Sequence, residues 1–160
     1  MTLFISADLW RTATRSLHDR PYDRERVAFL DGPVPAKSGP AVATTVVLPE
    51  LENTWGNYRI SPEAMSRAGR HLRCLGLLRL AQIHSHPSDW TGHSDHDNDY
   101  AFSHRDGAVS IVVPNYGACY PGLHDCGIHV CRDGEWREIS DSSIDHVVRV
   151  LPSLMDFYTP

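Results

Sequence analysis

The sequence predicts a single α/β domain, in which helices and β-strands alternate along the chain. Amphipathic helical patterns and short apolar strand patterns follow one another, without internal repeats or low-complexity tracts. The 160 residues are enough for one core that needs neither a disulfide nor a structural metal. Asp133-Gly134, between two strand-like segments, is a strong hairpin signal and predicts an antiparallel pair.

The first elements are predicted from a cap and from apolar runs. Ser6 caps a helix that ends before Pro21 and whose apolar face is formed by Leu9, Trp10, Ala13 and Leu17. Strands are predicted at Arg26–Leu30 and Ala41–Leu48. Between them, Asp31–Pro40 holds three prolines and two glycines and is expected to be a surface loop.

The later elements follow the same alternation. Ser61-Pro62-Glu63 is a strong helix start, and this helix is predicted to end near Leu75. The remaining predictions are a strand over Leu77–Ile83, a helix over Asp95–His104, strands at Val109–Val113, Gly127–Arg132 and Glu135–Ile139, and a last helix over Ser142–Leu151. Leu48–Ile60 and Asn115–Cys126 are predicted to be long loops, the kind of segment that often carries recognition.

The most informative stretch is His84-Ser85-His86-Pro87, which is followed by Ser94 and Asp97. A strand that ends here delivers both histidines, and its period of two places the imidazoles on one face. Pro87 lacks an N–H and ends the strand. If Ser94 begins a helix, Asp97 lies in its first turn, close to both histidines. Two imidazoles and one carboxylate leave a fourth position open, as in hydrolytic zinc sites.

Other interpretations of these residues remain open. Ser94 and Asp97 also form an ordinary helix N-terminal pattern, in which the hydroxyl caps free amides. His93 and His96 could reach a nearby metal, but His93 precedes the helix and His96 is expected to point away from Asp97. A second zinc site is a weaker hypothesis, because the interleaved cysteines lack a CxxC spacing; they are Cys119, Cys126 and Cys131.

With Glu25 upstream at the start of a hydrophobic strand, the HxHP-x6-SxxD pattern resembles the JAMM family of zinc peptidases, also called MPN-type. The resemblance implies one Zn²⁺ per chain, held by His84, His86 and Asp97. It implies Glu25 as general base and acid, and Ser94 as hydrogen-bond donor to the tetrahedral oxyanion. Without the downstream motif, Glu25 would be interpreted as a solvated strand end in a charged segment.

The same resemblance covers most of the chain and implies a three-layer α/β fold, with a mixed central β-sheet flanked by helices. This is the JAMM/MPN, cytidine-deaminase-like architecture, and we expect residues 1–160 to form one such domain. The implied activity is cleavage after the C-terminal Gly-Gly of a ubiquitin-like protein, by deconjugation or precursor processing. The implied partners are that protein or its conjugate, with ubiquitin-activating-like and conjugating-like enzymes of a bacterial antiviral operon.

Two other functions are weighed against this one. A peptidase acting on a sulfur-carrier adduct would use the same site, and a metal-free JAMM-type scaffold would lack the ligands that are present here. The net charge of −5, without a long Lys/Arg run, argues against a nucleic-acid or anionic-membrane partner. No apolar run approaches the length of a signal-peptide core or a membrane span, so a cytoplasmic protein is expected.

Overall fold

The central element of the computed structural model is a six-stranded sheet; the structure describes residues 1–18, 23–37 and 39–155. Its strand order is β10-β9-β8-β7-β2-β4. β7 and β8 pair parallel and the other neighbours pair antiparallel, so the sheet is mixed, as predicted. The strands are β2 (Val27–Pro33), β4 (Thr45–Val47), β7 (Leu77–Ser85), β8 (Val109–Val113), β9 (Gly127–Arg132) and β10 (Glu135–Glu138).

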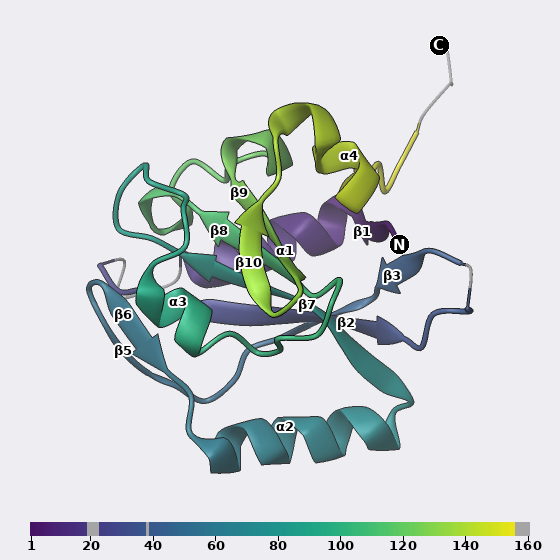
Figure 1. Ribbon diagram of the computed structural model, residues 1–160, viewed down its shortest axis with the longest axis horizontal. Helices are drawn as coiled ribbons and strands as arrows, with labels where there is room; N and C mark the ends of the chain where they lie inside the picture. Colours follow the sequence, from purple (N-terminus) through teal and green to yellow (C-terminus); the bar gives the residue numbers. More distant parts are fainter. Residues whose placement is uncertain (19–22, 38, 156–160) are drawn as a thin grey trace.

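Two smaller sheets accompany it. In the first, β1 (Leu3–Ser6) lies between β3 (Ala41–Ala43) and β11 (Val148–Leu151), and both pairings are parallel. The second is an antiparallel hairpin, β5 (Glu52–Thr54) with β6 (Asn57–Arg59), which lies at the left of Figure 1.

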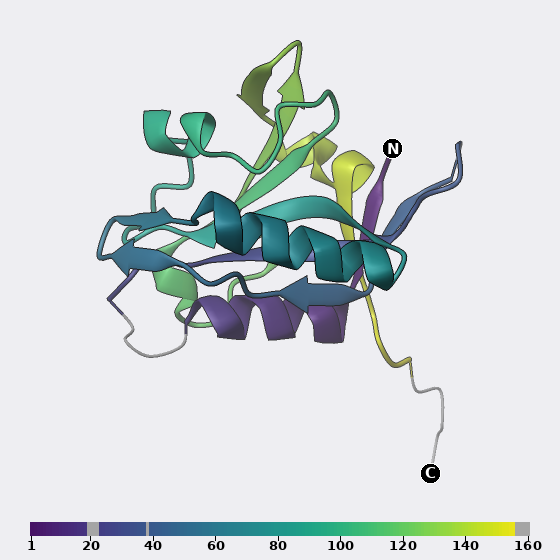
Figure 2. The ribbon, with the colours of Figure 1, turned by 90° about the horizontal axis from the view of Figure 1, so that it is seen from below.

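The helices lie around the main sheet, and Figure 2 shows α1 and α3 on opposite sides of it. They are α1 (Ala7–Leu17), α2 (Pro62–Cys74), α3 (Asp95–Asp99) and α4 (Ile144–Val147), with single 3₁₀ turns at Asn115–Gly117, Leu123–Asp125 and Asp141–Ser143. The two longer helices begin at the predicted caps. The Ser6 hydroxyl accepts a hydrogen bond from the Leu9 N–H, and the Ser61 hydroxyl accepts one from the Ala64 N–H. This flanked mixed sheet is the predicted fold class.

Strand β2 is buried on both faces and separates two apolar clusters. Ala28 and Leu30 face the main core, which α1 covers with Trp10, Ala13 and Leu17. Val27 and Phe29 face the other way, into a smaller cluster with Tyr58 of the hairpin. In the neighbouring strand, Val27 pairs with His84 and Phe29 with Gln82. Since paired residues share a face, His84 points away from the main core, into the side of the sheet that the hairpin covers.

Two predicted helices are wrong in extent. The helix expected over Asp95–His104 ends at Asp99, because the Phe102 N–H bonds to Gln82 Oε1 and draws the chain back to β7. The helix expected over Ser142–Leu151 is α-helical only over Ile144–Val147, after the 3₁₀ turn at Asp141–Ser143. Its last residues form β11, where the β-branched Val148 and Val150 pair with Leu3 and Ile5 of β1.

Three boundaries in the first half also differ. β2 continues to Pro33 through the segment expected to be a loop, and a Cβ at Gly32 would lie 2.0 Å from the Val42 carbonyl oxygen, so glycine permits this close crossing. The strand expected over Ala41–Leu48 is two strands that join different sheets. The loop expected over Leu48–Ile60 contains the β5–β6 hairpin. Pro21, the expected limit of the first helix, lies outside the described residues.

Helix α2, β7, β8 and the β9–β10 hairpin lie where they were predicted, within a residue or two. Over the described ranges, no helix is long and apolar enough to cross a membrane.

Candidate metal centre

His84 and His86 lie at the end of β7 and, as predicted, share one face. Their Nε2 atoms are 3.2 Å apart. Asp97 completes a triangle, since its Oδ1 lies 3.2 Å from His84 Nε2 and its Oδ2 lies 3.2 Å from His86 Nε2. All three residues are buried. We call these three residues the metal centre.

The geometry of this group fits a metal ion. Donors at about 2.0–2.1 Å from a tetrahedral ion lie about 3.3 Å from one another, close to the separations found here. Two imidazole nitrogens and a carboxylate oxygen are ligands that zinc accepts. Within the described ranges, this is the group of histidine, cysteine and acidic side chains whose ligand atoms converge closely enough to hold an ion.

The ring of His86 is held in the orientation that a metal ligand needs. Its Nδ1 donates to the Trp90 carbonyl oxygen at 3.0 Å, so Nε2 is the ring nitrogen that faces Asp97 and the centre. The Trp90 indole stacks on the imidazole, with ring centroids 5.1 Å apart. A Cβ on Gly92 would lie 2.8 Å from that indole, so glycine is required for this stacking.

Asp97 and His84 also favour the charge states that a cation needs, whereas His86 favours its protonated form. Burial alone raises the pKa of Asp97, but hydrogen bonds from His84 and His86 lower it far below its ordinary value, so the carboxyl is ionised. Burial lowers the pKa of His84, which is therefore neutral. Burial also lowers the pKa of His86, but the bond and charge of Asp97 outweigh it and raise that pKa overall. A cation bound at His86 Nε2 would displace the proton that this raised pKa favours.

Asp97 is positioned by the first turn of α3, as predicted. The Ser94 hydroxyl accepts from the Asp97 N–H at 3.2 Å, and the Ser94 N–H donates to Asp97 Oδ2 at 2.8 Å, so the two residues form a capping box. Ser94 Oγ also donates to Asp97 Oδ2 at 2.6 Å. Both interpretations of Ser94 therefore have a basis: it caps the helix, and it also lines the hollow beside the ligands.

Glu25 is buried next to the metal centre, not solvated. It precedes β2, and Arg26 is fixed beside the ligands because its carbonyl accepts from the Ser85 N–H at 3.0 Å. Burial raises the pKa of Glu25 to about 7; the charge of His86 opposes this and that of Asp97 adds to it. A carboxyl group poised near neutrality beside a cation site suits general acid–base chemistry.

The centre opens to solvent through a hollow of about 190 Å³. Glu25 and the metal-centre residues His86 and Asp97 line it, and so do two largely exposed indoles, Trp55 at the hairpin tip and Trp90. Aromatic side chains therefore form part of the lining of a small hollow.

Comparisons with known proteins agree with this geometry. A probable metalloprotease from Sinorhizobium fredii is 29% identical over 92 residues, which are 57% of this chain and 56% of that protein. The chain thus matches little more than half the length of this curated relative. A protein of Desulfitobacterium hafniense, solved in solution, superposes with a TM-score of 0.64 at 15% identity, covering 96% of this chain and 95% of that one. No family model matches.

A JAB1/MPN domain protein from Archaeoglobus fulgidus decides the fold, with a TM-score of 0.51 at 18% identity over 92% of this chain and 98% of that one. This chain has the JAB1/MPN fold. The fold, the Sinorhizobium relative and the metal centre agree with the resemblance of the sequence to JAMM/MPN-type metalloproteases.

The two other histidines considered as ligands, His93 and His96, are not part of the metal centre. His93 bonds to Asn98 Oδ1 and Ser110 Oγ, each at 3.0 Å, and burial lowers its pKa to about 3. His96 lines the hollow, but its Nε2 donates to the Tyr58 carbonyl at 3.0 Å. The hypothesis of a second zinc site is not supported: the thiols are free, and no second converging group occurs in the part of the chain that the structure describes.

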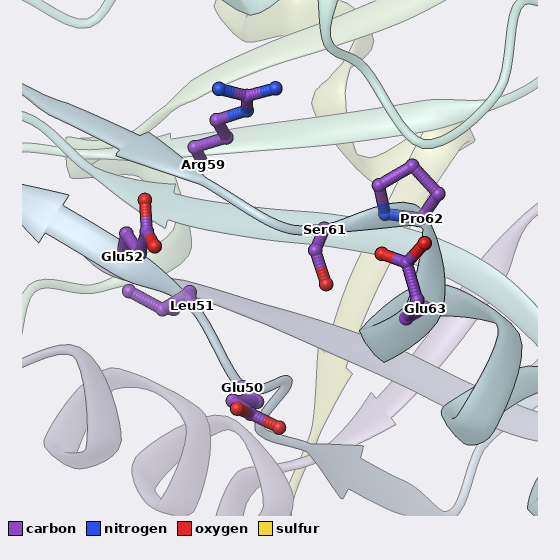
Figure 3. Close-up of a pocket in the computed structure, with 7 residues that line it drawn as sticks. All are labelled: Glu50, Leu51, Glu52, Arg59, Ser61, Pro62 and Glu63. Carbon is purple, nitrogen blue, oxygen red and sulfur yellow. The ribbon is translucent and has the colours of Figure 1, made fainter.

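A second hollow, of about 300 Å³, lies where the hairpin meets the start of α2. Figure 3 shows carboxylates of Glu50, Glu52 and Glu63 around it, with Arg59 as its cation. These carboxylates do not form a converging ligand group, so this hollow differs from the metal centre.

Sequence reasoning missed how the site is assembled around its ligands. Asn53 and Tyr116 contact the segments that carry Glu25 and His86, yet both lie in stretches expected to be loops. The hairpin turn Trp55-Gly56 is not a strong turn dipeptide, and Gly56 is not among the residues with positive φ. No local signal therefore marked this hairpin.

Proposed function

We propose that this protein is a zinc-dependent peptidase that cleaves the peptide or isopeptide bond after the C-terminal Gly-Gly of a ubiquitin-like protein. The observation that carries the proposal is the metal centre with buried Glu25 at its side. The JAB1/MPN fold and the metalloprotease relative support hydrolysis of an amide bond.

Each residue has a role in this proposal. His84, His86 and Asp97 would hold one zinc ion, which supplies an activated water and polarises the scissile carbonyl. Glu25 would accept a proton from the attacking water and pass it to the leaving amine. Ser94 donates to the oxyanion once its O–H turns from Asp97 Oδ2 toward the hollow.

The small volume of the hollow supports a Gly-Gly substrate. A space of about 190 Å³, lined in part by two indoles, favours residues with small side chains beside the scissile bond. Glycine has no Cβ and adopts the extended and turned conformations that such a passage requires. The proposed partner is therefore a ubiquitin-like protein, or its conjugate, that offers an extended tail.

Metal analysis tests the ligand set. The purified protein should hold one zinc per chain, and His84→Ala should lose it. His93→Gln is the matched control, because the His93 ring lies 5.8 Å from His84 but outside the ligand triangle. A folded His84→Ala protein with stoichiometric zinc would show that the ligand assignment is wrong.

Cleavage assays test the substrate. Ubiquitin fused through its Gly-Gly tail to a second protein should be cut, and a chelator should stop the reaction. Replacing the residue before the scissile bond with alanine should lower kcat/KM steeply. Equal rates on unrelated extended peptides would leave only a general metallopeptidase.

A further inference from the structure

The β5–β6 hairpin is bound to the metal centre's surroundings through its main-chain carbonyls. Four carbonyl oxygens of Glu52–Arg59 accept hydrogen bonds from residues outside it. The donors are Arg24 to Asn53 O at 3.0 Å, the Glu25 N–H to Thr54 O at 2.9 Å, the Tyr116 hydroxyl to Trp55 O, and His96 to Tyr58 O at 3.0 Å. Two of these donors, Glu25 and His96, line the hollow at the metal centre.

Glu25 depends on this hairpin for both of its main-chain hydrogen bonds. Its N–H donates to Thr54 O, and its carbonyl accepts from Asn53 Nδ2 at 2.9 Å. Glu25 lies before β2 begins at Val27, outside the paired register of the main sheet. The hairpin therefore fixes the main chain at Glu25, just before β2, and so places this carboxylate beside the ligands.

Tyr116 holds the tip of the hairpin. Its N–H donates to the His86 carbonyl at 2.8 Å, and its hydroxyl donates to the Trp55 carbonyl at the hairpin tip. Its φ of +52° is uncommon for a bulky residue and is retained only where surrounding contacts fix it. Tyr116 thus links the strand end that carries a ligand to the wall of the hollow.

The underside of the hairpin is fixed too. Tyr58 is buried, its hydroxyl accepts from Gln82 Nε2 at 2.8 Å, and its ring lies 5.8 Å from that of His84. The hairpin is therefore attached to both strands of the site, β7 directly and β2 through Glu25.

We propose that the β5–β6 hairpin positions Glu25 at the metal centre, with Asn53 and Tyr116 as its positioning residues. The proposal rests on the proposed function, in which Glu25 transfers the proton. Neither side chain reaches the reacting atoms; they act by fixing the backbone on which Glu25 stands. A displacement of about 1 Å in a catalytic group can cost about 10²-fold in rate.

The first experiment compares Asn53→Ala with Asn57→Ala, a change of the same residue on the other strand of the hairpin, where the side chain is exposed. Asn53→Ala should lower kcat about 10- to 100-fold, with KM and zinc content near wild type. In protein without metal or substrate, exchange of the Glu25 amide, followed by NMR, should become about fivefold faster, as expected when one hydrogen bond is lost. Asn57→Ala should change neither quantity.

The second experiment compares Tyr116→Phe with Tyr120→Phe. Both changes remove one hydroxyl from the same loop, and Tyr120 is exposed. Tyr116→Phe should speed Glu25 amide exchange and lower kcat, each less than Asn53→Ala does, while Tyr120→Phe should match wild type. Amides of Phe29 and Leu30, in the core of β2, should exchange at wild-type rates in all four variants.

The proposal would be overturned if Asn53→Ala kept both the kcat and the Glu25 amide exchange rate of the wild type. Faster exchange throughout β2 would also overturn it, because the effect would then be a general loss of stability. Failure of the proposed function looks different: wild type would show no metal-dependent cleavage, or Glu25→Gln would remain active. The exchange measurement needs neither metal nor substrate and separates the two.

Discussion

Glu25 carries an ionisable group inside the protein, and its proton affinity follows from that position. Burial raises its pKa from 4.5 to about 7. Between these values the folded protein without metal keeps a proton that the unfolded chain has lost. The free energy of unfolding therefore falls as pH rises through this window and is highest, as far as Glu25 contributes, below pH 4.5.

Glu25→Gln should remove this contribution. We expect the metal-free wild type to lose about 3 kcal/mol more than Glu25→Gln between pH 4.5 and 7. Chemical denaturation of both proteins at several pH values measures the difference. Parallel pH profiles would mean that Glu25 titrates as an exposed carboxyl. In the zinc-loaded protein, Glu25→Gln should keep the metal and lose about 10²–10⁴-fold in turnover.

Ser94 has two interpretations that a single substitution separates. As oxyanion donor, Ser94→Ala should slow turnover about 10²–10³-fold with zinc retained, because the donor acts on charge that develops in the transition state. As helix cap alone, it should cost about 1 kcal/mol of stability and leave turnover unchanged. Steady-state kinetics, metal content and melting temperature of this variant decide, and we expect both effects because the hydroxyl caps α3 and lines the hollow.

At the scale of elements, the segment between His86 and Asp97 is held by β9. His129 of β9 donates to the Thr91 carbonyl at 2.9 Å. Gly127, at the start of β9, lies against the same carbonyl, and a Cβ there would be 2.0 Å from the Thr91 oxygen. The position of Trp90 and His93 around the ligands therefore depends on a backbone contact in which glycine is required.

Gly127→Ala should force this segment away from β9. We expect a loss of about 1–3 kcal/mol in stability, typical of overpacking, and weaker zinc binding. Denaturant titration and competition with a chelator measure the two effects. Gly69→Ala in α2 is the control, since its Cβ would meet only the flexible Arg73 side chain at 3.4 Å, and alanine favours a helix. Equal stability of the two variants would contradict the argument.

At the scale of the whole molecule, the sequence predicts the parts whose signals are local. Ser6 and Ser61 mark helix starts because a cap is decided by residues three positions away. The strand that carries His84 and leads into His86 is apolar enough to be recognised, and Asp133-Gly134 directly identifies the β9–β10 hairpin. The ligand triangle follows from the same kind of reasoning, because strand period and helix start fix its geometry.

What could not be predicted depends on contacts between distant segments. Val148 and Val150 become strand because β1, at the other end of the sequence, offers an edge. The three-residue strands β5 and β6 have no apolar alternation, and they form where Tyr58, Glu25 and Tyr116 hold them. Asn53 and Tyr116 were missed for this reason. They act through hydrogen bonds to main-chain groups of other segments, and no residue pattern in the sequence encodes such bonds.

Two of the proposed ligands, His84 and Asp97, differ in how firmly the fold holds them, and this difference bears on the kinetics of ion exchange. His84 stands in a strand hydrogen-bonded on both sides, where opening requires disruption of the whole sheet. Asp97 stands on a five-residue helix that can open locally. The ion should therefore leave on the time scale of this local opening, with a dissociation rate independent of the global unfolding rate, and a chelator should strip the protein without unfolding it.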